Sequence, residues 1–233
     1  MSQPGDKAPV QRFARSGSAV ESFLEKAGQV APPSSKKGRL IFALDATMSR
    51  QPTWDLAVSL QARMFDTASS LGGLDVQLVY FRGFSECRAS SWVAGGEGLA
   101  RLMTKINVQG GHTQIAKVLR HARDEAGRAP VAVLVYVGDA MEEDPDSLAG
   151  IAGELGLLGT KAFMFHEGRD ARAELVFRDL ARLTGGVYAA FDANAPAHLA
   201  SLLAAAAAYA AGGRAALERH GTEAARLLLT QMR

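Results

Sequence analysis

Apolar runs alternate with helical patterns along the chain from Arg39 onward. Short continuous apolar runs are typical of strands buried on both faces of a parallel sheet, whereas apolar residues three and four apart are typical of amphipathic helices. The runs predict strands at 39–44, 76–81, 84–93, 130–137, 161–165 and 186–191. The helical patterns predict helices at 51–71, 98–106, 114–126, 148–158, 171–183, 196–211 and 214–229, with a hinge at Gly212-Gly213.

This alternation favours an α/β fold with a doubly wound, mostly parallel central sheet and helices on both faces. The run 130–137 is the most continuous, so we expect it at the centre of the sheet. Cys87 and Arg88 interrupt the run 84–93. We therefore expect that run to form one antiparallel edge strand, paired in a hairpin with the strand before it.

The first 37 residues differ in composition from the rest. Residues 1–37 are interpreted as an N-terminal tail with a short amphipathic helix at 18–29 and a linker rich in Pro, Ser and Lys from 31. The apolar Phe23 and Leu24 favour docking of this helix, and a small recognition arm is the alternative. A domain at 38–210 follows, and the helix within 211–233 is expected to dock on it.

Charge and cysteine content narrow the function classes. The chain has 26 basic and 24 acidic residues, a net charge of +2 and no strongly basic block, so composition does not favour nucleic-acid binding. Only Lys36, Lys37, Arg39 and the basic C-terminal helix support it. Cys87 is the single cysteine and the N-terminus lacks the apolar core of a signal peptide, which predicts a reducing cytoplasm.

One apolar segment, 197–211, is mostly alanine and carries His198 and Ser201. It is shorter than the roughly 20 residues that a membrane span needs. The pattern favours a helix that packs within a soluble domain through its leucines.

Oxygen-bearing side chains follow two of the predicted strands and precede one helix. In open α/β sheets, ligands bind at the carboxyl ends of the strands, where the strand order reverses. Asp45, Thr47 and Ser49 follow the first strand at alternate positions, which point to the same side of an extended chain. Thr113 precedes the helix at 114–126, and Asp139 follows the strand at 130–137.

In the usual doubly wound order the strands at 39–44 and 130–137 are neighbours, so Asp45 and Asp139 would face each other. The candidate set is then two carboxylates and three hydroxyls. Mg²⁺ prefers oxygen ligands and is held by one or two carboxylates, while zinc and copper favour Cys and His. The set therefore predicts a site for Mg²⁺ or Mn²⁺.

Each donor alone also has an ordinary structural interpretation. Ser49 and Thr113 could begin helices, Asp139 could be a turn residue, and Asp45 could cap the following helix. The acids that follow Asp139 could complement the dipole of the helix at 148–158, although Glu142 is close enough to Asp139 to support a ligand. The position of all five donors at one predicted sheet edge favours a joint site.

The stretch Asp45-Ala46-Thr47-Met48-Ser49 resembles the metal-ion-dependent adhesion site (MIDAS) of von Willebrand factor A (VWA) domains. That site has an Asp-x-Ser-x-Ser strand end, a threonine in a second loop and an aspartate in a third. Thr113 and Asp139 stand at matching places, and the resemblance covers residues 38–210. Thr47 stands where the family more often has serine and Met48 where it has glycine, so a bulkier rim could change partner choice.

The resemblance implies a VWA-like fold in which Mg²⁺ takes a glutamate or aspartate from a partner protein. Intracellular bacterial relatives commonly work beside ATPases or in multi-protein assemblies rather than as enzymes. The implied function is a non-catalytic, Mg²⁺-dependent protein-interaction module with Asp45, Thr47, Ser49, Thr113 and Asp139 as metal ligands.

A metal-dependent hydrolase or phosphotransferase that uses the same rim is the alternative. The chain has no Gly-x-x-x-x-Gly-Lys-Ser/Thr loop and no Gly-x-Gly-x-x-Gly after the first strand. A phosphatase with Asp45 as nucleophile would be expected to carry a second aspartate where Thr47 stands. Cys87 has no identifiable base and is expected to be unreactive. His112 adjoins Thr113 and could touch a bound carboxylate, although a loop histidine is more often solvated.

Overall fold

A computed structural model describes residues 37–47, 73–94, 96–192 and 195–232, together with Asp55, Ala57, Asp66 and Thr67. The chain divides into two units between Lys36 and Lys37, and every described residue belongs to the second. The predicted helix at 18–29, most of the helix at 51–71, Met48 and the candidate ligand Ser49 lie outside the described residues.

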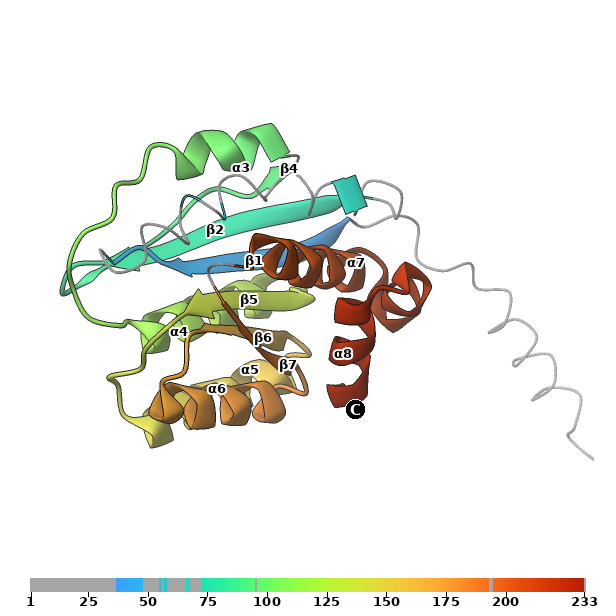
Figure 1. Cartoon of the computed structure of the whole chain (residues 1–233). Coiled ribbons are helices and arrows are strands. Elements are labelled where there is room, and N and C mark those ends of the chain that lie inside the picture. Colours follow the sequence, from blue (N-terminus) through green and yellow to red (C-terminus); the bar gives the residue numbers. More distant parts are fainter. Residues whose placement is uncertain are drawn as a thin grey trace, which may run out of the picture. The chain divides into compact units, whose positions relative to one another are not determined.

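A mixed sheet forms the middle layer (Figure 1). Within the described residues its seven strands are β1 (Gly38–Asp45), β2 (Leu74–Arg82), β3 (Glu86–Ala89), β4 (Val93–Ala94), β5 (Val133–Gly138), β6 (Lys161–Glu167) and β7 (Val187–Phe191). The strand order is β3-β2-β1-β5-β6-β7, and β4 also pairs with β2. Only β3 and β4 run antiparallel to their neighbour among these strands, so the predicted sheet is confirmed.

Helices cover both faces of this sheet (Figure 1). They are α3 (Gly96–Met103), α4 (Ile115–Arg128), α5 (Pro145–Leu157), α6 (Ala171–Leu183), α7 (Pro196–His220) and α8 (Glu223–Gln231). Successive side chains of β1 point to opposite faces, so Phe42 lies in the core beneath α3, α7 and α8, whereas Ile41 lies in the core beneath α4, α5 and α6. Both are fully buried, which explains the continuous apolar run.

The prediction of one helix at 214–229 was wrong. α7 continues to His220, and Gly221 then adopts a left-handed conformation with φ 65°. The Thr222 hydroxyl accepts a hydrogen bond from the Ala225 N–H at 3.1 Å and so begins α8. The predicted hinge is confirmed, because Gly212 and Gly213 have non-helical backbone angles within α7.

The antiparallel edge is shorter and more divided than the prediction of a single strand at 84–93. β3 and β4 are separated around Ser90, whose hydroxyl accepts a hydrogen bond from the Leu78 N–H at 3.1 Å. Between β3 and β4, the Ser90 hydroxyl thus serves as the acceptor for a backbone N–H of β2, where a regular strand would supply a carbonyl.

Among the described residues, α7 is long and apolar enough to cross a membrane. In this fold 61% of its apolar window is buried. Its leucines, including Leu199 and Leu203, belong to the core against the sheet.

Candidate metal centre

β1 and β5 are neighbouring parallel strands that end at the same edge of the sheet. Leu44 of β1 pairs with Val137 of β5. Asp45 comes one residue after Leu44, and Asp139 comes two residues after Val137. The chain leaves β1 toward β2 on one side and reaches β5 on the other, so the strand order reverses between β1 and β5. The predicted adjacency of these two strands is confirmed, and their ends form the position where ligands bind in such sheets.

The end of β1 has a fixed geometry. Asp45 is only 3% exposed, and its Oδ1 accepts a hydrogen bond from the Thr47 N–H at 2.8 Å. The Ala46 N–H donates to the Phe81 carbonyl at 2.9 Å, and the Ala46 carbonyl accepts from the Gln109 N–H at 3.0 Å. These bonds orient the Asp45 carboxylate and place the buried Thr47 beside it.

Thr113 is held by Glu142 from the loop that follows β5. The Thr113 hydroxyl accepts a hydrogen bond from the Glu142 N–H at 3.1 Å, and the Glu142 carboxylate accepts from the Thr113 N–H at 3.0 Å. The same carboxylate lies 3.0 Å from His112 Nδ1. This reciprocal pair joins two of the three candidate ligand loops, so Glu142 supports the site through Thr113.

Thr113 does not cap α4, so that ordinary interpretation was wrong. The residue at the N-cap position is Gln114, and its side chain makes no capping hydrogen bond. The Glu143 carboxylate accepts hydrogen bonds from the Ile115 and Ala116 N–H groups, the second at 3.0 Å. Burial nevertheless raises the pKa of Glu143 above its usual value, because it outweighs these two backbone donors.

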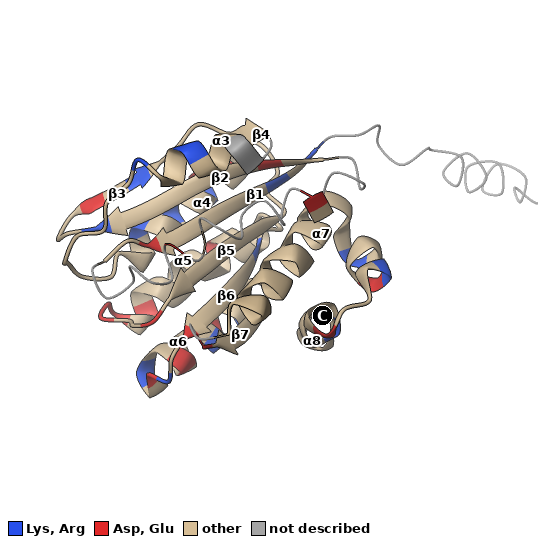
Figure 2. Ribbon diagram, turned by 45° about the horizontal axis from the view of Figure 1, so that its top comes forward, with Lys and Arg blue, Asp and Glu red and all other residues tan. Residues whose placement is uncertain are grey.

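Glu143 therefore caps α4 rather than the helix that follows it in sequence. Asp144 does cap its own helix, since its Oδ2 accepts from the Ser147 N–H at 2.9 Å. Figure 2 shows acidic residues gathered in the loop that leads from β5, which has no charged residue, to α5. The helix-dipole interpretation of this cluster thus holds for Asp144 and was wrong for Glu143.

The backbone of Asp139 is positioned by a buried histidine. His166 on β6 is fully buried, with Nε2 3.3 Å from the Asp139 carbonyl oxygen and Nδ1 2.9 Å from the Tyr188 hydroxyl. These two contacts run from β7 through β6 to the end of β5. The sequence alone offered no sign of them, because the three residues are far apart in the chain.

The described donors fit a hard cation. Asp45, Thr47, Thr113 and Asp139 offer only oxygen, and two carboxylates with several waters are the usual protein ligands of Mg²⁺. No three His, Cys, Asp or Glu side chains gather in a metal-binding arrangement in the part of the chain that the structure describes.

No protein-family model and no curated protein matches this sequence. Among solved structures, the SpRpn10 VWA domain is similar with 8% identity and a TM-score of 0.55, over 70% of this chain and 95% of that one. The chain has a VWA-like fold. At this identity the likeness concerns the fold alone.

Two further structures share the VWA-like fold. An aerotolerance-related membrane protein from Bacteroides fragilis with multiple mutations to serines has 15% identity and a TM-score of 0.51, over 69% of this chain and 95% of that one. Proximal thread matrix protein 1 from the mussel byssus, with a zinc-occupied MIDAS motif, has 15% identity and a TM-score of 0.58. That match covers 73% of this chain and 46% of the mussel protein.

The three loops that the MIDAS resemblance indicates lie together at one edge of the VWA-like fold. The first two are joined by the bond between Ala46 and Gln109, and the last two by the pair Thr113 and Glu142. Of the five predicted ligands, Asp45, Thr47, Thr113 and Asp139 lie in or beside these loops.

Proposed function

We propose that this chain is a non-catalytic protein-interaction module that depends on Mg²⁺ or Mn²⁺. The metal ligands in this proposal are Asp45, Thr47, Ser49, Thr113 and Asp139. The observation that carries it is the pairing of β1 with β5, which brings Asp45 at the end of β1 and Asp139 directly after β5 to one edge, while Glu142 bonds to Thr113 from the loop after β5.

Three of the four described ligands contact a neighbouring group at the rim. The Thr47 N–H orients the Asp45 carboxylate, Glu142 orients the Thr113 hydroxyl, and His166 contacts the carbonyl of Asp139. When bound, the divalent ion would supply an electrophilic centre for a carboxylate from a partner protein. Thr113 can accept from Glu142 and still offer an oxygen lone pair, because a hydroxyl has two.

The zinc-occupied MIDAS motif of the mussel protein supports divalent-metal binding in this fold. The choice of Mg²⁺ or Mn²⁺ for this chain rests on its all-oxygen donor set. A partner that offers Glu or Asp, such as an ATPase or another component of an assembly, and a cytoplasmic location complete the proposal.

The test is capture of partners from a native lysate of the source cells in Mg²⁺ and in EDTA, with hydrolysis of a generic phosphoester measured on the same protein. We expect a retained protein that is lost in EDTA and with Asp45→Ala, and no turnover. Metal-dependent turnover that Asp45→Ala abolishes, with no retained protein, would favour the hydrolase instead.

A further inference from the structure

An exposed aromatic ring lies beside the loop that carries Thr113. Phe84 occupies the turn between β2 and β3 and is 79% exposed. Its ring is 5.2 Å from that of His112 in an edge-to-face arrangement, and His112 directly precedes Thr113. An isolated exposed apolar residue is ordinary on a protein surface, and what distinguishes Phe84 is the position in which it is held.

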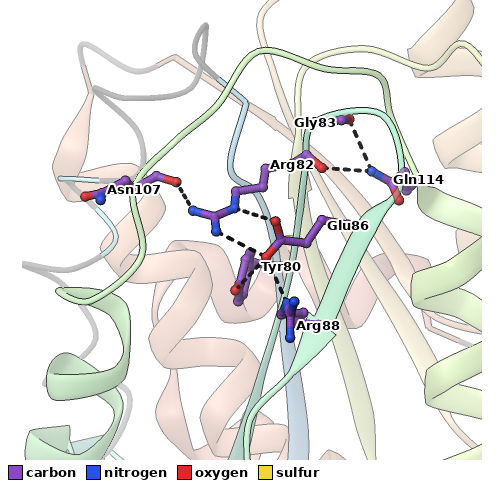
Figure 3. Close-up of polar contacts among 7 residues, drawn as sticks. All are labelled: Tyr80, Arg82, Gly83, Glu86, Arg88, Asn107 and Gln114. Carbon is purple, nitrogen blue, oxygen red and sulfur yellow. Dashed lines mark hydrogen bonds and ion pairs between the residues drawn. The ribbon is translucent and has the colours of Figure 1, made fainter.

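Polar contacts tie the turn of Phe84 to both ends of the loop at 107–114 (Figure 3). The Arg82 guanidinium donates to the Asn107 carbonyl at 2.6 Å and pairs with Glu86 at 3.0 Å. At the other end, the Gln114 side-chain amide donates to the carbonyls of Arg82 at 3.2 Å and Gly83 at 3.3 Å. The turn and the loop are therefore braced as one unit.

The same two segments touch through their backbones. The His112 N–H donates to the Gly83 carbonyl at 3.1 Å. A Cβ atom at Gly111 would lie only 1.9 Å from the Gly83 oxygen, so this approach requires glycine. Phe84 consequently has a set position relative to Thr113, one of the proposed metal ligands.

We propose that Phe84 and His112 form a specificity surface beside the metal, which contacts an aromatic or large aliphatic side chain of the partner. This inference rests on the proposed function, and it adds the chemistry that flanks the partner's carboxylate. An extended chain advances about 3.3 to 3.6 Å per residue, so partner residues within three positions of that carboxylate lie within roughly 11 Å of it, and these are the positions where we expect the apolar preference.

On the side of Glu142, the charges beside this surface favour an apolar flank over further acids. His112 is 62% exposed in its side chain and contacts Glu142, which is 50% exposed. Glu142, Glu143 and Asp144 lie in one loop, so a second acid of the partner on the side of Glu142 would meet like charge. Lys117, which donates to the Ser85 carbonyl at 2.7 Å, carries positive charge on the other side. The partner that fits best carries one acidic residue with an apolar neighbour, rather than a run of acids.

The test is selection from two displayed peptide libraries, each in Mg²⁺ and in EDTA. Both libraries have randomised flanks; the central residue is a fixed Asp or Glu in one and is randomised in the other. For the full-length chain we expect Mg²⁺-dependent enrichment of the acid and, within three positions of it, of Phe, Tyr, Trp, Leu, Ile or Met. With Phe84→Ala we expect the acid to remain enriched while the apolar preference disappears.

Selected peptides then allow a quantitative comparison. Because hot-spot contacts are often aromatic, Phe84→Ala is expected to weaken binding of such a peptide about fivefold to tenfold, and Phe84→Leu to restore most of it. Leu157→Ala is the matched control, since Leu157 is 90% exposed and ends α5 just before β6 begins, at the opposite edge of the sheet. Its peptide affinity is expected to equal that of the unaltered chain.

Two results would overturn the inference in different ways. Enrichment of the acid with no apolar preference, or with a preference that Phe84→Ala leaves unchanged, contradicts the role of Phe84 and leaves the proposed function standing. No Mg²⁺-dependent enrichment of the acid contradicts both.

Discussion

Glu142 and His166 determine where two of the proposed metal ligands lie, although neither is a ligand in the proposal. Glu142 exchanges hydrogen bonds with both the backbone and the hydroxyl of Thr113, and His166 contacts the Asp139 carbonyl. Supporting groups of this kind fix ligand orientation and contribute to metal affinity. At the scale of single residues, the candidate site is therefore larger than the ligand set that the sequence predicts.

Cys87 provides a test of the local electrostatics away from this site. Burial raises the pKa of its thiol to about 11, with Glu143 adding to the increase and Lys117 opposing it. Because the thiolate is the reactive form, alkylation by iodoacetamide at pH 8 is expected to be about a hundredfold slower than for an unperturbed cysteine. The alkylation rate should rise as the pH increases toward 11.

The control for Cys87 is the same reaction in denaturing urea, where the thiol should regain ordinary reactivity. The thiol of the folded protein would contradict this account if it reacted as fast at pH 8 as the denatured chain.

Among the elements, the loop before α4 closely approaches the turn after β2, and this approach requires glycine at position 111, two residues before the proposed ligand Thr113. Alanine at 111 would place its Cβ against the Gly83 carbonyl, so the backbone must shift. Gly111→Ala is expected to lower the free energy of unfolding by about 1–3 kcal/mol, as overpacking does, and to weaken metal binding by moving Thr113.

Gly110→Ala is the matched control, because a Cβ at Gly110 meets nothing within 4 Å. Urea unfolding measures the stability of both variants. Equal stability of the two would show that the contact between Gly111 and Gly83 does not constrain the loop.

The sequence predicted the strands and helices well wherever the signal for them is local. The buried strands β1 and β5 show as continuous apolar runs because both of their faces are covered. The break at Gly221 was missed because the helical pattern continues across it and only the left-handed backbone reveals the stop. Thr113 was predicted as a candidate ligand, but its contact with Glu142 joins residues 29 positions apart and no local pattern shows it.

At the scale of the whole molecule, the C-terminal helix completes the core on one face of the sheet. Leu228 of α8 is fully buried in that core, whereas its neighbour Leu227 is 39% exposed. The Gln231 amide also bonds to the backbone of Tyr188 on the edge strand β7, at 3.0 and 2.9 Å. The helix thus supplies both apolar contact and edge pairing, which protects an exposed strand.

Leu228→Ala is expected to reduce the free energy of unfolding by about 2–5 kcal/mol, the usual cost of deleting a buried leucine side chain. Leu227→Ala should cost less than about 1 kcal/mol, because that side chain is partly in water. Chemical unfolding of both variants measures the difference. Similar losses for the two would mean that α8 does not pack as described.

The proposed function depends on a divalent-metal site formed at the ends of β1 and β5. Calorimetric titration of the full-length chain with Mg²⁺ and with Mn²⁺, beside Asp45→Ala and Asp139→Ala, tests it most directly. We expect a saturable one-site binding isotherm for the unaltered chain that is absent in both variants, with all three proteins equally folded by circular dichroism. Identical traces for the unaltered chain and the two variants would contradict it.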